Sequence, residues 1–482
     1  MIWESVIGIE VHVELATRSK MFCGCAVGFG DEPNTNICPT CLGLPGALPA
    51  PNEAALESIM AIGMALNCTV APTSVFHRKN YFYADLPKNY QISQFDVPIC
   101  IEGHLDVTVG DATRTVGIER AHMEEDTGKS THISIGGRIH AASSTLLDFN
   151  RSGVPLVEIV SKPEIHSAAE ARAYAQSLRS VVAELGVSDA RLEEGSIRFD
   201  ANVSVRPEGQ EALGTKVEVK NMNSFRSLER AVQYEIDRQI ELIESSGTVV
   251  QETRHWDEEA GVTRSMRTKE GSSDYRYFAE PDLVPMRMDE EWVERIRATL
   301  PELPADRIER YVVSGLDAGL AAVLSSGDFP MRALYESAVS EGADARSAAN
   351  WVTGEVTAWL RREDRADAGD LLTGRQLAEL IDLIDQGTVS SSAAKDVLDG
   401  VLSGEGDPGA VARSRDLLQI SDTAAIEEAV DTVLADNPDA LESLRSGETK
   451  VLGFLVGQVM KATQGKADPR LVNQVIRARG GD

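Results

Sequence analysis

Apolar and polar residues alternate in three segments of the first half of the chain. In residues 7–15 every odd position is apolar, and Glu10 and His12 lie among the even positions between them. Residues 198–206 and 216–220 repeat this period of two. The pattern is typical of strands with one buried and one polar side. We therefore expect a mostly antiparallel sheet with one polar working face.

Helical spacing of apolar residues dominates elsewhere. It occurs in residues 168–185, 228–244, 291–299, 376–386 and 424–434. Short alternating runs end near residue 290, and helices separated by polar breaks follow, with a Gly- and Pro-containing hinge at residues 403–409. The pattern predicts an α+β protein in which a sheet-based domain precedes an all-α region.

Composition limits the function without deciding it. The chain has 482 residues, is 42% hydrophobic and carries a formal net charge of −29. Phosphate contacts supply most non-specific affinity for nucleic acids, so this acidity argues against a broadly basic nucleic-acid binder. A local basic surface, or positive charge supplied by magnesium or a partner, is still compatible with RNA binding.

The chain shows no sign of a targeting segment or membrane span. An acidic residue, Glu4, stands near the start where a signal peptide would be basic, and no apolar run approaches about 20 residues. We expect a cytoplasmic protein that does not enter a membrane. In that reducing compartment six cysteines are not expected to form a disulfide framework.

Four cysteines are packed into two close pairs. They are Cys23, Cys25, Cys38 and Cys41. Two such pairs can converge on one tetrahedral zinc ion, and four thiolates leave no open position, so the ion would be structural. Cysteines without a metal, buried or redox-active, are the alternative. Cys68 and Cys100 lack such neighbours and are expected to pack in the core.

The polar face of the first strand is a second candidate site. Side chains two apart on a strand point the same way, so Glu10 and His12 can reach one divalent ion. A further carboxylate can come from residues 122–126, His-Met-Glu-Glu-Asp. Magnesium bound by carboxylates and phosphate oxygens would suit phosphoryl transfer. A salt-bridged outer sheet face is an equally good interpretation of the same residues.

Two basic segments have a nucleic-acid interpretation. Residues 78–83, Arg-Lys-Asn-Tyr-Phe-Tyr, combine cations and aromatic rings that suit phosphate binding and base stacking, although core aromatics beside a basic pair look the same. The last stretch of the chain is locally basic, which fits a tRNA contact or a solvated helix end. Gly128-Lys129-Ser130 does not end a Walker A motif, because Met123 occupies the position of its first glycine.

Several long motifs resemble the B subunit of the bacterial Asp/Glu-tRNA amidotransferase. They are residues 7–15, 78–83 with Gln91-Ile92-Ser93-Gln94, 122–126, 148–151, 193–196, 220–224, Asp274-Tyr275-Arg276-Tyr277-Phe278 and Met460-Lys461-Ala462-Thr463. The resemblance spans nearly the whole chain. It implies a cradle-shaped catalytic domain at residues 1–293 with a zinc-binding insert, a helical domain at 294–405, and a small tail domain similar to the YqeY family, contacting tRNA, at 406–482.

The resemblance also implies a ligase activity in protein biosynthesis. ATP would phosphorylate the side-chain carboxylate of mischarged Glu-tRNA(Gln) or Asp-tRNA(Asn), and ammonia would then displace phosphate. The implied partners form a heterotrimer with this chain: an amidase, the A subunit, which releases ammonia from glutamine, and a small third protein, the C subunit. A carboxylate needs such activation because it is a poor acyl donor without a leaving group.

Site residues follow from the matching motif positions. The implied magnesium ligands are Glu10, His12 and Glu125. Further acidic candidates, for a second ion or for orienting the first, are Glu124, Glu194 and Asp200. Candidates for holding ATP or the acyl phosphate, on motif membership and charge, are Lys79, Asn80 and Lys220. The cysteines that match zinc-binding members are Cys23, Cys25, Cys38 and Cys41.

Two other functions are compatible with the sequence. One is a non-catalytic tRNA-binding scaffold in the same complex, whose acidic face is structural. The other is a zinc-dependent hydrolase, against which four thiolates filling the zinc coordination sphere argue. Whether Glu-tRNA(Gln), Asp-tRNA(Asn) or both are substrates depends on the synthetases of the cell.

Overall fold

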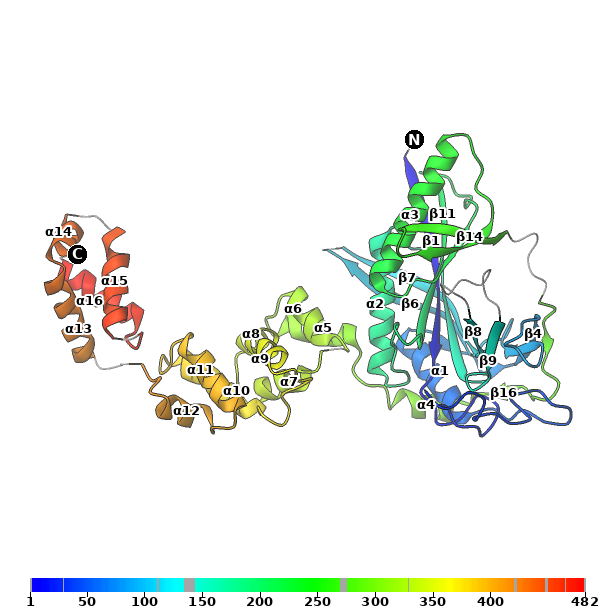
Figure 1. Ribbon diagram of the computed structural model, residues 1–482, viewed down its shortest axis with the longest axis horizontal. Coiled ribbons are helices and arrows are strands. Elements are labelled where there is room, and N and C mark those ends of the chain that lie inside the picture. The colour runs from blue at the N-terminus through cyan, green and yellow to red at the C-terminus, as the bar shows by residue number, and fades with distance from the viewer. Residues whose placement is uncertain are drawn as a thin grey trace. The chain divides into compact units, whose positions relative to one another are not determined.

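The computed structural model divides the chain into two compact units, Met1–Leu303 and Pro304–Asp482 (Figure 1). It describes residues 2–28, 30–110, 112–133, 144–268, 275–327, 329–419, 423–446, 450–463 and 465–480. Asp274, at the start of one motif quoted above, lies outside these residues.

A large sheet organises the first unit. Within the described residues its nine strands follow the order β14-β13-β12-β11-β1-β10-β7-β6-β2. Their bounds are β1 Trp3–Glu14, β2 Thr69–Val70, β6 Cys100–Val109, β7 Ala112–Glu125, β10 Pro155–Ser161, β11 Ile197–Pro207, β12 Val217–Lys220, β13 Glu252–Asp257 and β14 Val262–Thr268. Neighbours pair antiparallel except β12 and β13, which are parallel. The expected mostly antiparallel sheet is confirmed.

Three smaller sheets accompany the large one. They are β15-β4-β5, with bounds Phe278–Ala279, His77–Asn80 and Tyr90–Ser93; β16-β3, Met286–Arg287 with Thr73–Ser74; and β8-β9, Lys129–Ile133 with Ser144–Asp148. Gly128-Lys129-Ser130 thus leads into a strand and not into the helix that a phosphate-binding loop requires.

Helices cover the apolar side of the sheet. They are α1 Glu53–Ala65, α2 Ala168–Glu184 and α3 Phe225–Glu244, and α4 Glu290–Arg297 packs on the same core. Side-chain oxygens of Ser167 and Ser224 cap the first turns of α2 and α3 by accepting backbone N–H groups that would otherwise lack partners. The odd residues of β1 from Ile7 to Val13 are fully buried in this core, so its even residues face the opposite side.

Both lone cysteines lie where the sequence places them, in or against the core. Cys100 is fully buried in β6, and Cys68 packs against the same cluster. A Cβ added at Gly63 would clash with the Cys100 sulfur, which shows how closely α1 approaches this strand.

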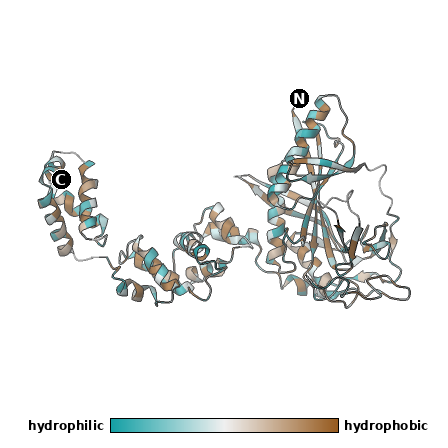
Figure 2. Cartoon of the chain, viewed as in Figure 1, coloured by the Kyte–Doolittle hydropathy of each residue, from teal (hydrophilic) through white to brown (hydrophobic). Residues whose placement is uncertain are grey.

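The second unit is helical. Its α-helices are α5 Pro304–Val313, α6 Ala318–Ser325, α7 Arg332–Ser340, α8 Ala345–Trp351, α9 Thr357–Arg362, α10 Gly374–Asp385, α11 Ala393–Leu402, α12 Pro408–Ser414, α13 Thr423–Asp436, α14 Pro438–Arg445, α15 Lys450–Ala462 and α16 Pro469–Gly480. A π-helical turn, Val352–Val356, joins α8 to α9. Apolar and polar residues alternate around these helices (Figure 2), and the apolar ones form two clusters, one from Tyr311 to Ala412 and one from Ile426 to Ile476.

The predicted domain boundaries differ from the boundaries between the hydrophobic cores. The limit at 293/294 falls inside α4, whose Ile296 is buried in the first core. The limit at 405/406 precedes α12, whose Val411 and Ala412 belong to the cluster that starts at Tyr311. As limits of functional domains they stay predictions. Among the described residues every helix is too short or too polar to cross a membrane.

Candidate functional site

A pocket of ≈ 1000 Å³ lies on the polar face of the large sheet. Its acidic and imidazole side chains come from β1, β7, β10 and β12, and further walls come from β4 and from residues 275–277. Of the residues predicted for the site, the pocket lining includes Glu10, His12, Lys79, Asn80, Glu124 and Lys220. The structure thus gathers residues that are up to 210 positions apart in the chain.

Strand pairing aligns three ionisable side chains across neighbouring strands. His12 of β1 lies opposite Glu158 of β10, and Glu158 lies opposite His122 of β7. Nε2 of each histidine is 3.5 Å from Oε2 of Glu158. Burial lowers the pKa of His12, but the contact with Glu158 and the negative charges of Glu158, Asp200 and Glu124 together outweigh burial, and the net shift is upward. These three side chains therefore form a row across β1, β10 and β7, with a carboxylate between two imidazoles.

Glu124 completes a compact acidic centre. One ligand atom from each of His12, Glu124 and Glu158 lies within 4.8 Å of the other two. Glu124 accepts hydrogen bonds from Lys79 Nζ at 3.1 Å and from Ser93 Oγ at 2.8 Å. Burial favours the protonated acid, but the Lys79 charge together with His122 and His12 outweighs burial, and the pKa of Glu124 is held well below its usual value. Glu124 is therefore an ionised, buried carboxylate.

Glu10 lies beside this centre, in contact with β11. Its Oε1 accepts a hydrogen bond from Asn202 Nδ2 at 2.9 Å. Burial raises the pKa of Glu10, and the charge of Glu158 raises it further. Burial and the neighbouring carboxylate thus both favour the protonated form of Glu10. A divalent ion bound beside Glu10 would favour its ionised form instead.

Asp200 holds the second lysine of the site. It lies opposite Glu10 in the β1–β11 pairing, and Lys220 Nζ is 2.5 Å from its Oδ2 and 3.1 Å from Glu218 Oε1. Burial lowers the pKa of Lys220, but Asp200 and Glu218 outweigh burial, so the net shift is upward and the amine stays charged. Lys79 is held charged in the same way, by Glu124 and Glu158. The pocket thus has two half-buried ammonium groups, Lys79 beside Glu124 and Lys220 beside Asp200.

Two predicted acids are not part of this arrangement. Glu125 follows Glu124 on β7 and points to the other side of the strand, where it accepts hydrogen bonds from Lys88 Nζ and from the backbone N–H of Ile92. Successive strand residues face opposite ways, so Glu125 does not converge with Glu10 and His12 as the sequence-based magnesium set required. Glu194 lies in the turn before β11, exposed, with Arg191 2.6 Å away.

Sequence reasoning missed Glu158. It is the single charged residue in β10, Pro-Leu-Val-Glu-Ile-Val-Ser, whose other side chains are apolar or small. A charged side chain is rarely buried without a partner, so one glutamate within an apolar strand is a usable signal. No pattern within that segment indicates which residues lie opposite it.

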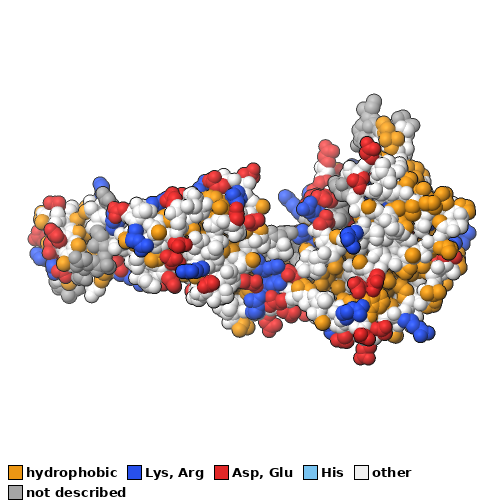
Figure 3. Space-filling view, turned by 90° about the horizontal axis from the view of Figure 1, so that it is seen from below, with side chains coloured by type: hydrophobic (Ala, Val, Ile, Leu, Met, Phe, Trp, Pro, Cys, Tyr) orange, Lys and Arg blue, Asp and Glu red, His pale blue; other side chains and the backbone are white. Residues whose placement is uncertain are grey.

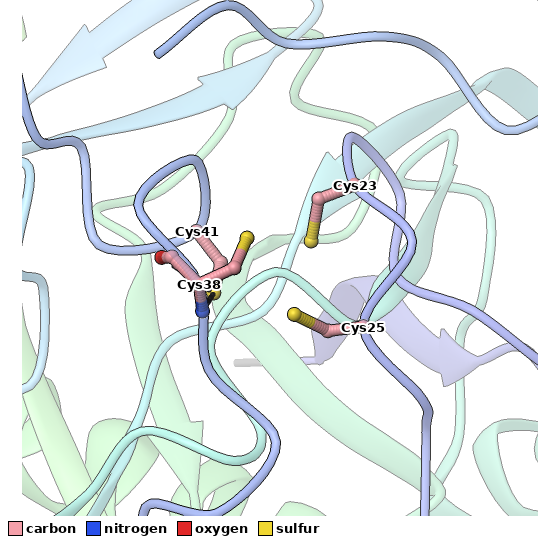
Figure 4. Close-up of side chains that lie close together, drawn as sticks. All are labelled: Cys23, Cys25, Cys38 and Cys41. Carbon is pink, nitrogen blue, oxygen red and sulfur yellow. Dashed lines mark hydrogen bonds between the residues drawn. The ribbon is translucent and has the colours of Figure 1, made fainter.

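The four paired cysteines converge as predicted from their spacing (Figure 4). Their sulfur atoms all lie within 4.8 Å of one another, whereas a tetrahedral zinc site with Zn–S bonds of about 2.3 Å places sulfurs about 3.8 Å apart. A hydrogen bond from Cys23 lowers the pKa of Cys41 to about 4, and the charge of Lys20 contributes. The geometry and the ready ionisation of Cys41 suit a thiolate-bound cation.

A smaller cavity of ≈ 190 Å³ separates this cluster from Glu125. Its lining includes Lys20, Cys23, Cys41, Lys88 and Glu125. Glu124 and Glu125 therefore line different cavities, although they are neighbours in the chain.

The chain thus combines a sheet-based domain that carries a buried acid–histidine centre beside two lysines with a helical region that follows it. Residues 5–294 match the family described as "GatB/GatE catalytic domain", and residues 333–479 match the "GatB domain". Three similar proteins are named as B subunits of "Aspartyl/glutamyl-tRNA(Asn/Gln) amidotransferase". The one from Moorella thermoacetica is 50% identical over 480 residues, covering 99% of this chain and 100% of its own. Those from Picosynechococcus sp. and Trichodesmium erythraeum are 49% and 50% identical, each covering 98% of this chain and 97% of its own.

The chain belongs to the family of amidotransferase B subunits that act on aspartyl- and glutamyl-tRNA. The resemblance inferred from the sequence motifs is confirmed, as is the expected order of a sheet-based catalytic domain and a helical region.

Proposed function

We propose that this chain uses ATP to activate the side-chain carboxylate of a glutamate or aspartate esterified to tRNA, which ammonia then converts to the amide. The names of the relatives supply the aminoacyl-tRNA substrates and the amidation. The observation that carries the ATP-dependent step is the convergence of His12, Glu124 and Glu158 beside Lys79 in one large pocket.

The reaction has two steps. A carboxylate oxygen of the esterified amino acid bonds to the γ-phosphorus of ATP while the bond from this phosphorus to the bridging oxygen breaks, and ADP leaves. Ammonia then bonds to the carbonyl carbon of the acyl phosphate and loses a proton, and inorganic phosphate leaves. Lys79 and Lys220 are both charged and attract the phosphate oxygens. These oxygens would replace the carboxylates that the two lysines now contact.

The acidic centre has the donors that a magnesium ion takes. Ligand atoms within 4.8 Å of one another all lie within about 2.8 Å of a common point, so side-chain movements of about 0.7 Å bring them to the Mg–O distance of about 2.1 Å. We assign this role to His12, Glu124 and Glu158, with Glu10 beside them, in place of the set that contained Glu125. When bound, Mg²⁺ neutralises charge on the triphosphate and on the transferring phosphoryl group.

We propose a structural zinc ion at the four cysteines. All four coordination positions would be filled by thiolates, which leaves none for a substrate or water. The ion would therefore hold the two cysteine pairs together and take no part in the transfer chemistry.

Amidation also needs ammonia from outside this chain. We propose that it comes from an amidase, the A subunit, held with the small C subunit in one complex. The relatives are named as one lettered part of an amidotransferase, which supports an enzyme made of several different chains. A tRNA contact in the C-terminal segment stays a prediction, and Arg479 there is 2.9 Å from Asp431.

The assembled complex provides the test. ADP formation that depends on Glu-tRNA(Gln) or Asp-tRNA(Asn), each assayed separately, is measured for Glu124→Gln and for the matched control Glu194→Gln. We expect Glu124→Gln to lose at least about 100-fold, because it removes a charge at the reacting centre, and the exposed control to keep wild-type turnover. Unchanged turnover in Glu124→Gln would contradict the kinase role and favour a binding scaffold.

A further inference from the structure

Aromatic rings form a continuous wall along one side of the large pocket. Tyr83 contacts Tyr81 with ring centroids 5.9 Å apart, and Tyr81 contacts Tyr275 at 6.0 Å. Tyr275 contacts Tyr277 at 6.0 Å, and Tyr277 stacks on Phe95 at 4.5 Å with planes 11° apart. All five rings line the same pocket. We call them, with Phe82 between two of them in the chain, the aromatic wall.

Backbone hydrogen bonds fix the wall. The backbone N–H of Asn80 donates to the carbonyl of Tyr275 at 2.9 Å, and its side-chain amide donates to the carbonyl of Arg276 at 2.9 Å. The pairing of β15 with β4 anchors the following residues. The two chain segments that carry most of the rings are thus held together at the edge of a small sheet. A platform fixed in this way does not need to be ordered when a ligand binds.

The outer rings of the wall are unusually open. Phe82, Tyr83 and Phe95 are 76%, 56% and 55% exposed. Grouped exposed aromatics indicate a surface that another molecule covers. Small-molecule sites enclose most of their ligand, whereas single-stranded nucleic acids stack successive bases on open aromatic platforms. The exposure favours a nucleic-acid end over the adenine of ATP.

The charges in the pocket also favour a nucleic-acid ligand. The whole chain has 47 Lys and Arg against 76 Asp and Glu, and acidic and basic side chains are interspersed on the face that Figure 3 shows. In the pocket lining, cations outnumber carboxylates by five to four: Lys79, Arg120, Lys216, Lys220 and Arg276 against Glu10, Glu124, Glu158 and Glu218. The pocket is therefore suited to a phosphate backbone that the chain as a whole would repel.

We propose that the aromatic wall stacks the unpaired bases at the 3′ end of the substrate tRNA. The inference rests on the proposed function, since the amino acid to be activated is esterified to the terminal ribose. Lys79 connects the wall to the acidic centre, because its Nζ lies 5.4 Å from the centroid of Tyr275 and 3.1 Å from Glu124 Oε1. Stacked bases would hold the esterified carboxylate next to that centre.

Binding measurements on the assembled complex test the assignment. The variant is Phe95→Ala, and the matched control is Phe278→Ala, an aromatic residue 48% exposed that lies outside the described pocket lining. The probes are substrate tRNA with an intact 3′ end, the same tRNA without its terminal adenosine, and ATP. Loss of one stacking ring weakens binding by about ten-fold. We expect this ten-fold weaker binding for Phe95→Ala only with the intact tRNA. Phe95→Trp should restore the affinity for intact tRNA, and Phe278→Ala should leave it unchanged.

The possible outcomes separate this inference from the proposed function. Wild-type affinity for intact tRNA in both Phe95→Ala and Phe82→Ala overturns it, and both residues are exposed enough that folding should be preserved. Weaker binding of ATP but not of tRNA also overturns it, since the wall would then hold adenine. A wild-type complex that binds neither ATP nor tRNA overturns the proposed function together with this inference.

Discussion

Replacement of Glu158 by glutamine is the most informative perturbation of the acidic centre. The change keeps the shape of the side chain and its position between His12 and His122, but it removes one negative charge. In the proposed function this charge binds magnesium. We therefore expect the magnesium requirement of the ATP-dependent step to rise.

The geometry sets the size of the effect. A divalent ion about 2.8 Å from a unit charge is attracted by about 12 kcal/mol at an effective dielectric constant of about 20. Most of this attraction is offset by dehydration of the ion and the carboxylate, and the amide oxygen of glutamine remains a weaker ligand. A net loss of about 3 kcal/mol is a reasonable remainder, and it corresponds to an approximately 100-fold higher magnesium concentration for half-maximal rate.

The assay is a magnesium titration of tRNA-dependent ADP formation in the assembled complex. Glu125→Gln is the comparison, since it makes the same chemical change one residue from Glu124 but on the other side of β7. It should lower thermal stability, because Lys88 loses its charged partner, without changing the magnesium dependence. A raised requirement in Glu125→Gln together with a normal one in Glu158→Gln would refute the assignment.

Three further predictions concern the cysteine cluster and the helical core. Cys38→Ser should lower zinc affinity by at least about 100-fold in a chelator competition, and wild-type retention of zinc would exclude a four-thiolate site. Lys20→Met should release zinc to a chelator about ten-fold faster, because a cation only 1% exposed beside Cys41 then no longer offsets thiolate charge; an equal release rate would show that Lys20 has no such effect. Leu455→Ala removes a fully buried side chain from the last helical cluster and should destabilise it by about 3 kcal/mol. Circular dichroism during thermal unfolding would detect that loss, and an unchanged curve would contradict it.

Periodicity predicts the parts of the fold that depend on local sequence. The alternation in residues 7–15 correctly assigns Glu10 and His12 to one face, because the side-chain period of a strand is two wherever the strand lies. The helices predicted at residues 168–185 and 228–244 follow from their apolar period, and the second begins three residues earlier than predicted, at Phe225 after its cap Ser224.

Pairing between distant strands is the part that local patterns do not contain. Residues 122–126 place acids at both parities, so the sequence does not indicate whether Glu124 or Glu125 faces Glu10. The pairing of β7 with β10 decides this, and it also brings Glu158 opposite His122. Such register depends on contacts between segments over 30 residues apart, which a single sequence does not specify.

The position of β7 between two cavities has a consequence for how the protein tolerates change. His122 and Glu124 of this strand line the acidic pocket, whereas Glu125 lines the cavity next to the cysteines and Ala121 and Met123 pack in the apolar core. Deletion of one residue upstream of Glu124 would slip the strand by one position, so that Glu125 would take the pocket position of Glu124 and Asp126 the position of Glu125. Glu124 would move to the position of Met123, which is fully buried in the apolar core, and would lose its contact with Lys79. The number of residues in β7 before Glu124 is therefore more tightly constrained than their identity. A deletion there should be more damaging than any single substitution in the strand.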